Sequence, residues 1–121
     1  MRGLILVVAD ASAERFRTAL VLAAAEAALG ARVLFFFQGE AVRSIVVPIA
    51  DPDGARQAAA GLPTLGQLVE EAKALGVEFA ACQSSLALLG LTPDDFDPAV
   101  EWGGMVGMLS QMGERDRLVV I

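Results

Sequence analysis

The chain has 121 residues, of which 55% are hydrophobic, and its 15 acidic and nine basic side chains give a formal net charge of −6. This length and apolar content predict one packed domain, residues 1–121. The few basic residues are scattered, which argues against nucleic acid and anionic membrane surfaces as partners, because both are bound through clustered cations.

The N-terminal third predicts two buried strands joined by a helix. Residues 4–9 form a continuous apolar run of strand length that ends at Asp10. The run is short and leads directly into a charged helix, so we interpret it as a strand and not as a signal peptide. Apolar residues then recur at helical spacing over 13–29 and Gly30 ends the helix. Residues 33–37 form the second apolar run.

The middle of the chain mixes turn residues with one well-marked helix. Residues 41–47 fit neither helical nor strand periodicity cleanly, and we favour a short helix. Proline, glycine and aspartate residues between 48 and 63 predict the most mobile loop. Thr64 and Gln67 then have the spacing of a capping box, which predicts a helix that continues to residue 75.

The last third predicts three short strands separated by short helices. The strands are expected at 77–81, 100–102 and 118–121, and the helices at 83–89 and 103–112, with a helical turn at 92–95. Strands that alternate with helices predict a mainly parallel sheet covered by helices on both faces, which is a three-layer α/β/α sandwich. No apolar run is long enough to span a bilayer.

Side chains at the carboxyl ends of the predicted strands are the candidate site residues, since ligands bind there in open α/β sheets. These residues are Asp10, Gln38, Gly39, Glu40, Cys82, Gln83, Ser84, Ser85, Glu101 and Trp102. The chain contains no histidine, which excludes histidine-dependent nucleophilic catalysis and the usual zinc and iron sites. We therefore predict neither a metal nor another cofactor.

Cys82 is the only cysteine, and it stands where a predicted strand runs into a helix. A thiol in that place faces unpaired N–H groups and the positive end of the helix dipole, which lower its pKa, so we expect a solvent-reachable thiolate. Ser84 and Ser85 keep this helix start polar. The alternative is a buried structural cysteine, because free cysteines are among the most buried residues. A lone cysteine also fits a reducing, cytoplasmic compartment.

Two patterns near the C-terminus are interpreted as structural. Gly103, Gly104 and Gly107 do not form a dinucleotide-binding fingerprint, so we expect them to allow close helix packing. Four apolar residues at helical spacing indicate core or subunit contact: Met105, Met108, Leu109 and Met112.

Four segments resemble landmarks of the DsrE/DsrF-like sulfur-relay family. They are FFFQGEAV at 35–42, LGVEFAAC at 75–82, LGL at 89–91 and VEWGGM at 100–105. The most specific part is the Gly-Val-x-x-x-Ala-Cys pattern followed by Leu-Gly-Leu. The resemblance implies a five-stranded parallel sheet, a homo-oligomer that is a trimer or a hexamer, and a persulfide carried on Cys82.

The resemblance further implies a sulfurtransferase-like carrier that passes sulfane sulfur between proteins, with a small sulfur-carrier protein or a rhodanese-type donor as partner. The binding residues around Cys82 are predicted to be Asp10, Gln38, Gly39, Gln83, Ser84, Ser85, Glu101 and Trp102. Two alternatives stay open. One is a non-catalytic oligomeric subunit for small-ligand binding or assembly with a structural Cys82, and the other is a small-molecule or nucleotide-binding enzyme that uses Asp10 and Glu101.

Overall fold

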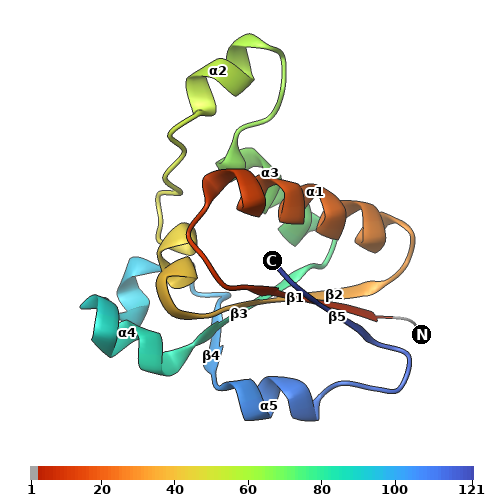
Figure 1. The fold of residues 1–121 in the computed structure, drawn as a ribbon. Coiled ribbons are helices and arrows are strands. Elements are labelled where there is room, and N and C mark those ends of the chain that lie inside the picture. Colours follow the sequence, from red (N-terminus) through yellow and green to blue (C-terminus); the bar gives the residue numbers. More distant parts are fainter. Residues whose placement is uncertain (1–2) are drawn as a thin grey trace.

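The structure is a computed structural model that describes residues 3–121, and its elements form a sheet between two helical layers (Figure 1). The strands are β1 (Gly3–Val8), β2 (Arg32–Phe37), β3 (Glu78–Cys82), β4 (Glu101–Gly103) and β5 (Arg117–Val120). The α-helices are α1 (Ala13–Ala28), α2 (Gly54–Ala59), α3 (Leu65–Ala74), α4 (Gln83–Leu89) and α5 (Met105–Ser110). Two 3₁₀ segments are η1 (Gly39–Ile45) and η2 (Pro93–Asp95).

All pairings within the five-stranded sheet are parallel, in the order β4-β3-β2-β1-β5. The predicted α/β fold with a parallel sheet is therefore confirmed. The chain moves outward from β1 to β4 and then crosses back to β5, which lies on the other side of β1. Because parallel crossovers are right-handed, this reversal places α5 on the face opposite to α1 and α3.

The two faces of the sheet bury unequal cores. The α1/α3 face holds the larger cluster, which includes a stack of Phe35 and Phe37 with ring centroids 5.4 Å apart and the edge of Phe16 against Phe37 at 5.5 Å. The α5 face holds a smaller cluster made by Ile5, Val7, Leu34, Phe36, Cys82 and Met108. Alternation of side chains along each strand divides these residues between the faces.

The capping signals in the sequence fix where the long helices start. Ser12 accepts a hydrogen bond from the Arg15 N–H at the start of α1. Thr64 and Gln67 form the predicted capping box of α3, with the Thr64 Oγ1 accepting from the Gln67 N–H at 3.3 Å and the Gln67 side chain accepting from the Thr64 N–H at 2.8 Å. Both helices agree with the sequence prediction to within a residue or two.

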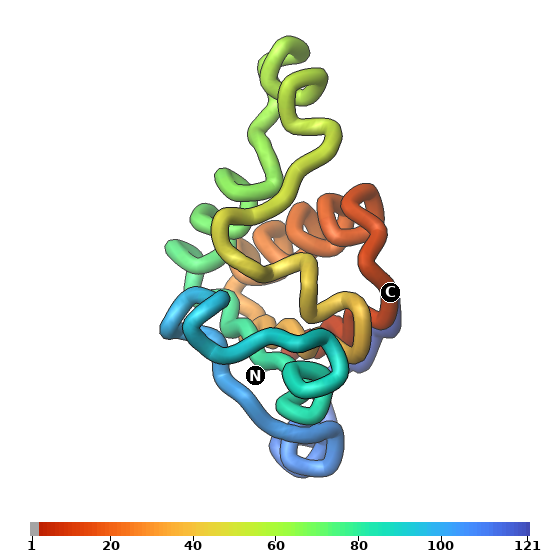
Figure 2. Tube along the Cα trace, turned by 90° about the vertical axis from the view of Figure 1, so that its left-hand side faces the viewer, coloured from red at the N-terminus to blue at the C-terminus, as the bar shows by residue number. Residues whose placement is uncertain are grey.

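The weakly patterned segments differ from the prediction. Residues 39–45 form a 3₁₀ segment, and the predicted loop contains α2, which buries no residue and projects beyond α1 and α3 (Figures 1 and 2). The predicted helix at 103–112 shortens to α5 because Gly104 is extended, with φ −123°. Within residues 3–121 no helix combines the length and the apolar character needed to cross a bilayer.

Candidate functional site

Cys82 is the last residue of β3 and the residue at which α4 begins. Its backbone is extended, with φ −71° and ψ 118°, and the chain turns helical at Gln83. Leu86 and Leu89 anchor α4 in the core, and Gly90 ends the helix in the left-handed conformation at φ 68°. The sequence therefore places the thiol at a strand-to-helix junction, as predicted.

The sulfur lies in an apolar layer and not at an open surface. Cys82 belongs to the cluster on the α5 face and is only 6% exposed, and Met108 of α5 belongs to the same cluster. The expectation of a solvent-reachable thiol is therefore wrong for this chain by itself. The physical reason is that α5 crosses back over the β3 face, which the order of elements in the sequence did not reveal.

Serine hydroxyls provide the polar contacts on the helix side of the sulfur. Cys82 Sγ and Ser84 Oγ are 3.1 Å apart and share a hydrogen bond. Ser85 is 4% exposed, and its Oγ accepts a hydrogen bond of 3.0 Å from the backbone N–H of Gly39. Because a hydroxyl accepts and donates at once, this contact leaves the Ser85 proton free to point at the sulfur.

Burial raises the pKa of the Cys82 thiol, but the hydrogen-bonding hydroxyls of Ser84 and Ser85 and the nearby backbone N–H groups of the same residues together lower it by more. The net pKa therefore lies below the ordinary value of a thiol. Within the described chain the Cys82 side chain makes no capping hydrogen bond to a helix N–H, so these amides act on the sulfur as nearby dipoles. The lowered pKa agrees with the prediction, but the serine hydroxyls lower it as well as the start of the helix.

Gln38 and Gly39 are brought to the thiol by the strand pairing. Gln38 continues β2 in an extended conformation, with φ −121° and ψ 137°. Phe37 pairs with Ala81, so the register places Gln38 beside Cys82 and on the same face. The Gln38 Oε1 is buried and has no hydrogen-bond partner among residues 3–121. Gly39 reaches the site through its N–H bond to Ser85 and holds φ at 60°.

Asp10 and Trp102 do not meet the sulfur. Asp10 accepts hydrogen bonds from the Ser12 N–H at 2.9 Å and from the Arg15 guanidinium at 3.0 Å, so it stabilises the start of α1. Trp102 pairs with Ala81 and packs against the core of the opposite face, with its ring 4.8 Å from that of Phe96. The Asp10 carboxylate and the Trp102 ring therefore make structural contacts, although Trp102 also lines a hollow on the Cys82 face.

Glu101, Gln83 and Glu40 lie at the margin of the site. Glu101 pairs with Ala80, which places its side chain on the Cys82 face but two residues before the strand end. Gln83 is exposed at the first position of α4, and Glu40 is exposed and accepts a hydrogen bond from Arg43 at 2.9 Å. The site therefore consists of Cys82, Ser84, Ser85, Gln38 and Gly39, with Glu101 nearby.

The glycines near the C-terminus have a role that the sequence analysis missed. A Cβ built at Gly103, Gly104 or Gly107 would meet no atom within 4 Å, so these residues do not serve close helix packing. All three line a hollow on the Cys82 face. The three closely spaced glycines were the signal in the sequence. Only the position of α5 shows that they line a hollow.

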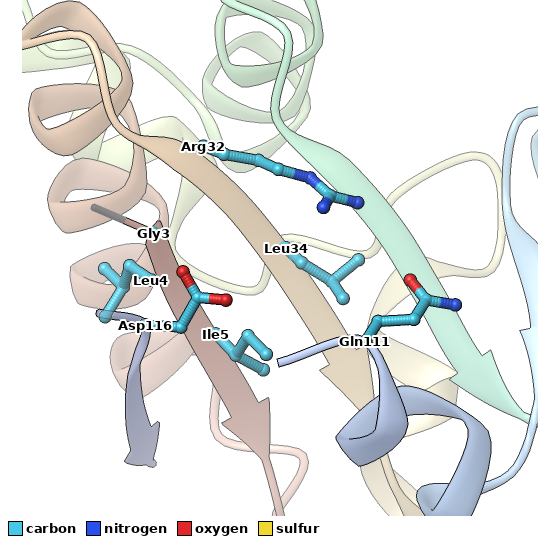
Figure 3. Close-up of a pocket in the computed structure, with 7 residues that line it drawn as sticks. All are labelled: Gly3, Leu4, Ile5, Arg32, Leu34, Gln111 and Asp116. Carbon is cyan, nitrogen blue, oxygen red and sulfur yellow. The ribbon is translucent and has the colours of Figure 1, made fainter. Parts of the chain in front are cut away.

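A second hollow lies at the amino ends of β1 and β2, away from the thiol (Figure 3). Its charged groups are engaged, since Arg32 forms two hydrogen bonds of 3.3 Å to Glu78 and Asp116 accepts from the Gly113 N–H at 2.8 Å. Across residues 3–121 no three acidic or cysteine side chains cluster closely enough to hold a metal ion.

One family of known proteins matches this chain. The sequence pattern of the DsrE/DsrF-like family matches residues 2–121. No curated protein matches the sequence.

Solved structures share the fold at low sequence identity. The chain is similar to the ychN protein from E. coli, with a TM-score of 0.74 and 17% identity over 100% of both chains. It is also similar to MTH1491 from Methanobacterium thermoautotrophicum, with a TM-score of 0.65 and 17% identity over 98% of this chain and 99% of that one. For BT1422 from Bacteroides thetaiotaomicron the TM-score is 0.64 and the identity 10%, over 98% and 94%. MTH1491 and BT1422 are described as proteins of unknown function.

Proposed function

Because this chain belongs to the DsrE/DsrF-like family, we propose that it is a sulfur carrier that holds sulfane sulfur as a persulfide on Cys82 and passes it to a partner protein. The observation that carries the proposal is the hydrogen bond of 3.1 Å between Cys82 Sγ and Ser84 Oγ, with the buried Ser85 hydroxyl on the same sulfur. These contacts favour the thiolate, which is the nucleophilic form of cysteine.

The proposed transfer conserves electrons. The Cys82 thiolate attacks the outer sulfur of a donor persulfide, a new S–S bond forms at Cys82, and the donor leaves as a thiolate. An acceptor thiolate then attacks the outer sulfur on Cys82 and restores the Cys82 thiolate. The sequence contains no second cysteine, so the sulfur leaves to another molecule and not to an internal disulfide.

Access to the sulfur requires local opening on the α5 face. Met108 is the one buried residue of α5, so little apolar contact holds this helix in place. Elements with few buried contacts open at a small fraction of the global unfolding free energy. We therefore propose that α5 moves when Cys82 reacts with donor or acceptor.

Mass spectrometry of the intact protein tests the carrier function. After incubation with a persulfide donor, wild type should gain about 32 Da, the mass of one sulfur atom, as expected for one persulfide. Cys82→Ser should gain nothing, and treatment with a reducing thiol should remove the added mass from wild type. Wild type that stays unmodified with every donor would contradict the function.

A structural Cys82 in a non-catalytic binding or assembly subunit is the second candidate, and the 6% exposure of the residue favours it. The two candidates differ in thiol reactivity. A carrier should react with an alkylating reagent under native conditions, with a rate that rises through the lowered pKa of the thiol. Under the second candidate, Cys82 should react only after denaturation.

The partners and the location are proposed along with the function. We propose a homo-oligomer, a trimer or a hexamer, and a small sulfur-carrier protein or rhodanese-type protein as exchange partner in the cytoplasm. Apolar side chains left exposed around α5 and β5 support self-association, among them Val106 at 84% and Val120 at 64%.

A further inference from the structure

The hollow beside the thiol, here called the glycine hollow, lies between the sheet and α5. Its lining residues are Leu34, Phe36, Ala80, Glu101, Trp102, Gly103, Gly104, Gly107, Met108 and Gln111. Gly104 and Gly107 belong to the start and the middle of α5, which lies alone under this face in Figure 1. No atom lies within 4 Å of a Cβ built on any of its three glycines, so side chains at these positions would have room.

The glycine hollow reaches the β-ladder partner of Cys82, although Cys82 itself does not line it. Gly103 is the direct β-ladder partner of Cys82, and Met108 lies in the same apolar cluster as the sulfur. Ala80, two residues before Cys82 on the same face, forms part of the floor. With the local movement of α5 proposed above, a molecule seated in the hollow would bring a sulfur atom to the thiol along the sheet face.

Glu101 and Gln38 supply hydrogen-bond acceptors around this space, while Gln111, which also lines it, has an amide that donates and accepts. Among residues 3–121, Glu101 is the only charged residue that lines the glycine hollow, and no described Lys or Arg lines it. On the other side of Cys82, Gln38 presents the buried Oε1 that has no partner among the described residues. A carboxylate and an unpaired carbonyl oxygen complement a cation with N–H donors, whereas an anion would meet repulsion from Glu101.

We propose that the glycine hollow receives the organic part of a small persulfide donor, and that Glu101 favours a donor with an ammonium group over an anionic donor. This inference rests on the proposed carrier function and names its substrate class, an aminothiol persulfide. The Cys82 thiolate attacks the outer sulfur, the S–S bond of the donor breaks, and the aminothiol leaves as a thiolate. No oxidant or reductant is consumed.

Loading rates with donors of different charge test the proposal. The probes are cysteamine persulfide, which carries an ammonium group, and glutathione persulfide, which has a net negative charge. The rate is the appearance of the added sulfur on Cys82 by mass spectrometry. Glu101→Gln should lower the cysteamine-to-glutathione rate ratio by roughly three- to tenfold, because a single charge near the reacting group changes association rates on this scale.

Two further variants make the result specific. Glu71→Gln removes one negative charge from the exposed surface of α3 on the opposite face and should leave the ratio unchanged. Gly107→Leu should narrow the hollow, since a Cβ built there meets no atom within 4 Å, and should slow loading by both donors while the pKa of the Cys82 thiol stays the same. Comparing each variant with wild type cancels the intrinsic reactivity of the two donors.

The loading experiments distinguish the proposed donor selection from the carrier function on which it rests. If Glu101→Gln leaves the cysteamine-to-glutathione rate ratio unchanged, the proposed charge selection is overturned. The same holds if Glu71→Gln changes this ratio as much as Glu101→Gln does. Neither result would contradict the carrier function. Unchanged loading of Gly107→Leu by both donors would overturn the hollow as the binding place. Failure of every donor to load wild type would overturn the carrier function and this inference with it.

Discussion

At the scale of single residues, the thiol is controlled by a short chain of hydrogen bonds. The Gly39 N–H occupies one lone pair of the Ser85 oxygen and leaves the Ser85 proton free to point at the sulfur, while Ser84 contacts the sulfur directly. Gly39 suits this position because its φ of 60° is costly for residues with a Cβ. The buried Ser85 thus links the end of β2 to the chemistry at the end of β3.

Removing either hydroxyl should raise the pKa of Cys82. Ser84→Ala and Ser85→Ala each delete a hydrogen bond that lowers this pKa, while the burial that raises it stays. We expect native-state alkylation at neutral pH to slow several-fold and its pH profile to move to higher pH. Ser110→Ala, which removes an exposed hydroxyl bonded to the Gly107 carbonyl, is the matched control. An unmoved profile in both serine variants would show that the hydroxyls do not stabilise the thiolate.

At the scale of elements, one ion pair joins α3 to the turn before β4. The Lys73 Nζ donates a hydrogen bond of 2.5 Å to the Asp97 Oδ2, and the two side chains are 30% and 31% exposed. Hydrogen bonding by Lys73 lowers the pKa of Asp97, and hydrogen bonding by Asp97 raises the pKa of Lys73. The pair fixes the segment that leads into β4, whose Gly103 is the ladder partner of Cys82.

This pair should contribute about 1 kcal/mol to the free energy of unfolding near neutral pH. Because the folded pKa of Asp97 is lowered, its contribution is present above the unfolded value of about 3.9 and is lost as the pH falls through the folded value. Because the folded pKa of Lys73 is raised, its contribution is present below the unfolded value of about 10.4 and is lost as the pH rises through the folded value.

Urea unfolding of wild type, Asp97→Asn, Lys73→Met and the double variant measures the coupling free energy of the pair. We expect a coupling free energy of about 1 kcal/mol at pH 7 and none at pH 2, where Asp97 is protonated. A coupling that persists at pH 2 would show that the contact is not ionic.

At the scale of the whole molecule, the two faces of the sheet differ in how well they are covered. Helices α1 and α3 cover one face with a large core, whereas α5 is short and leaves apolar side chains of β5 and of its own outer surface exposed. An edge strand with exposed apolar residues is an association surface. The same weak cover lies over Cys82, so the proposed assembly and the proposed access to the thiol involve one side of the molecule.

Val106 should lie at the subunit contact of the proposed homo-oligomer. Val106→Glu places a charge on a side chain that is 84% exposed, so the fold of the single chain should be unaffected. We expect a smaller species in sedimentation velocity, with the wild-type circular dichroism spectrum. Leu29→Glu changes a residue that is 79% exposed at the far end of α1 and serves as the control. An unchanged sedimentation coefficient in Val106→Glu would exclude this surface.

Local signals in the sequence were enough to predict the parallel sheet, the two long helices, the capping box of α3, and the placement of Cys82 at a strand-to-helix junction. Periodicity and capping depend on residues within a few positions of one another, so they can be read without coordinates. The same locality explains why Ser84 and Ser85 were recognised as neighbours of the sulfur.

The tertiary structure alone determined which candidates meet the thiol. The register between β2 and β3 brings Gln38 and Gly39 to Cys82, while Trp102 points to the other face and Asp10 stabilises α1. The crossover through α5 places Met108 in the cluster that buries the sulfur, and it leaves a hollow that is lined by three glycines. These features depend on the order of the strands and on the face that each crossover covers, and both are set by contacts between segments far apart in the chain.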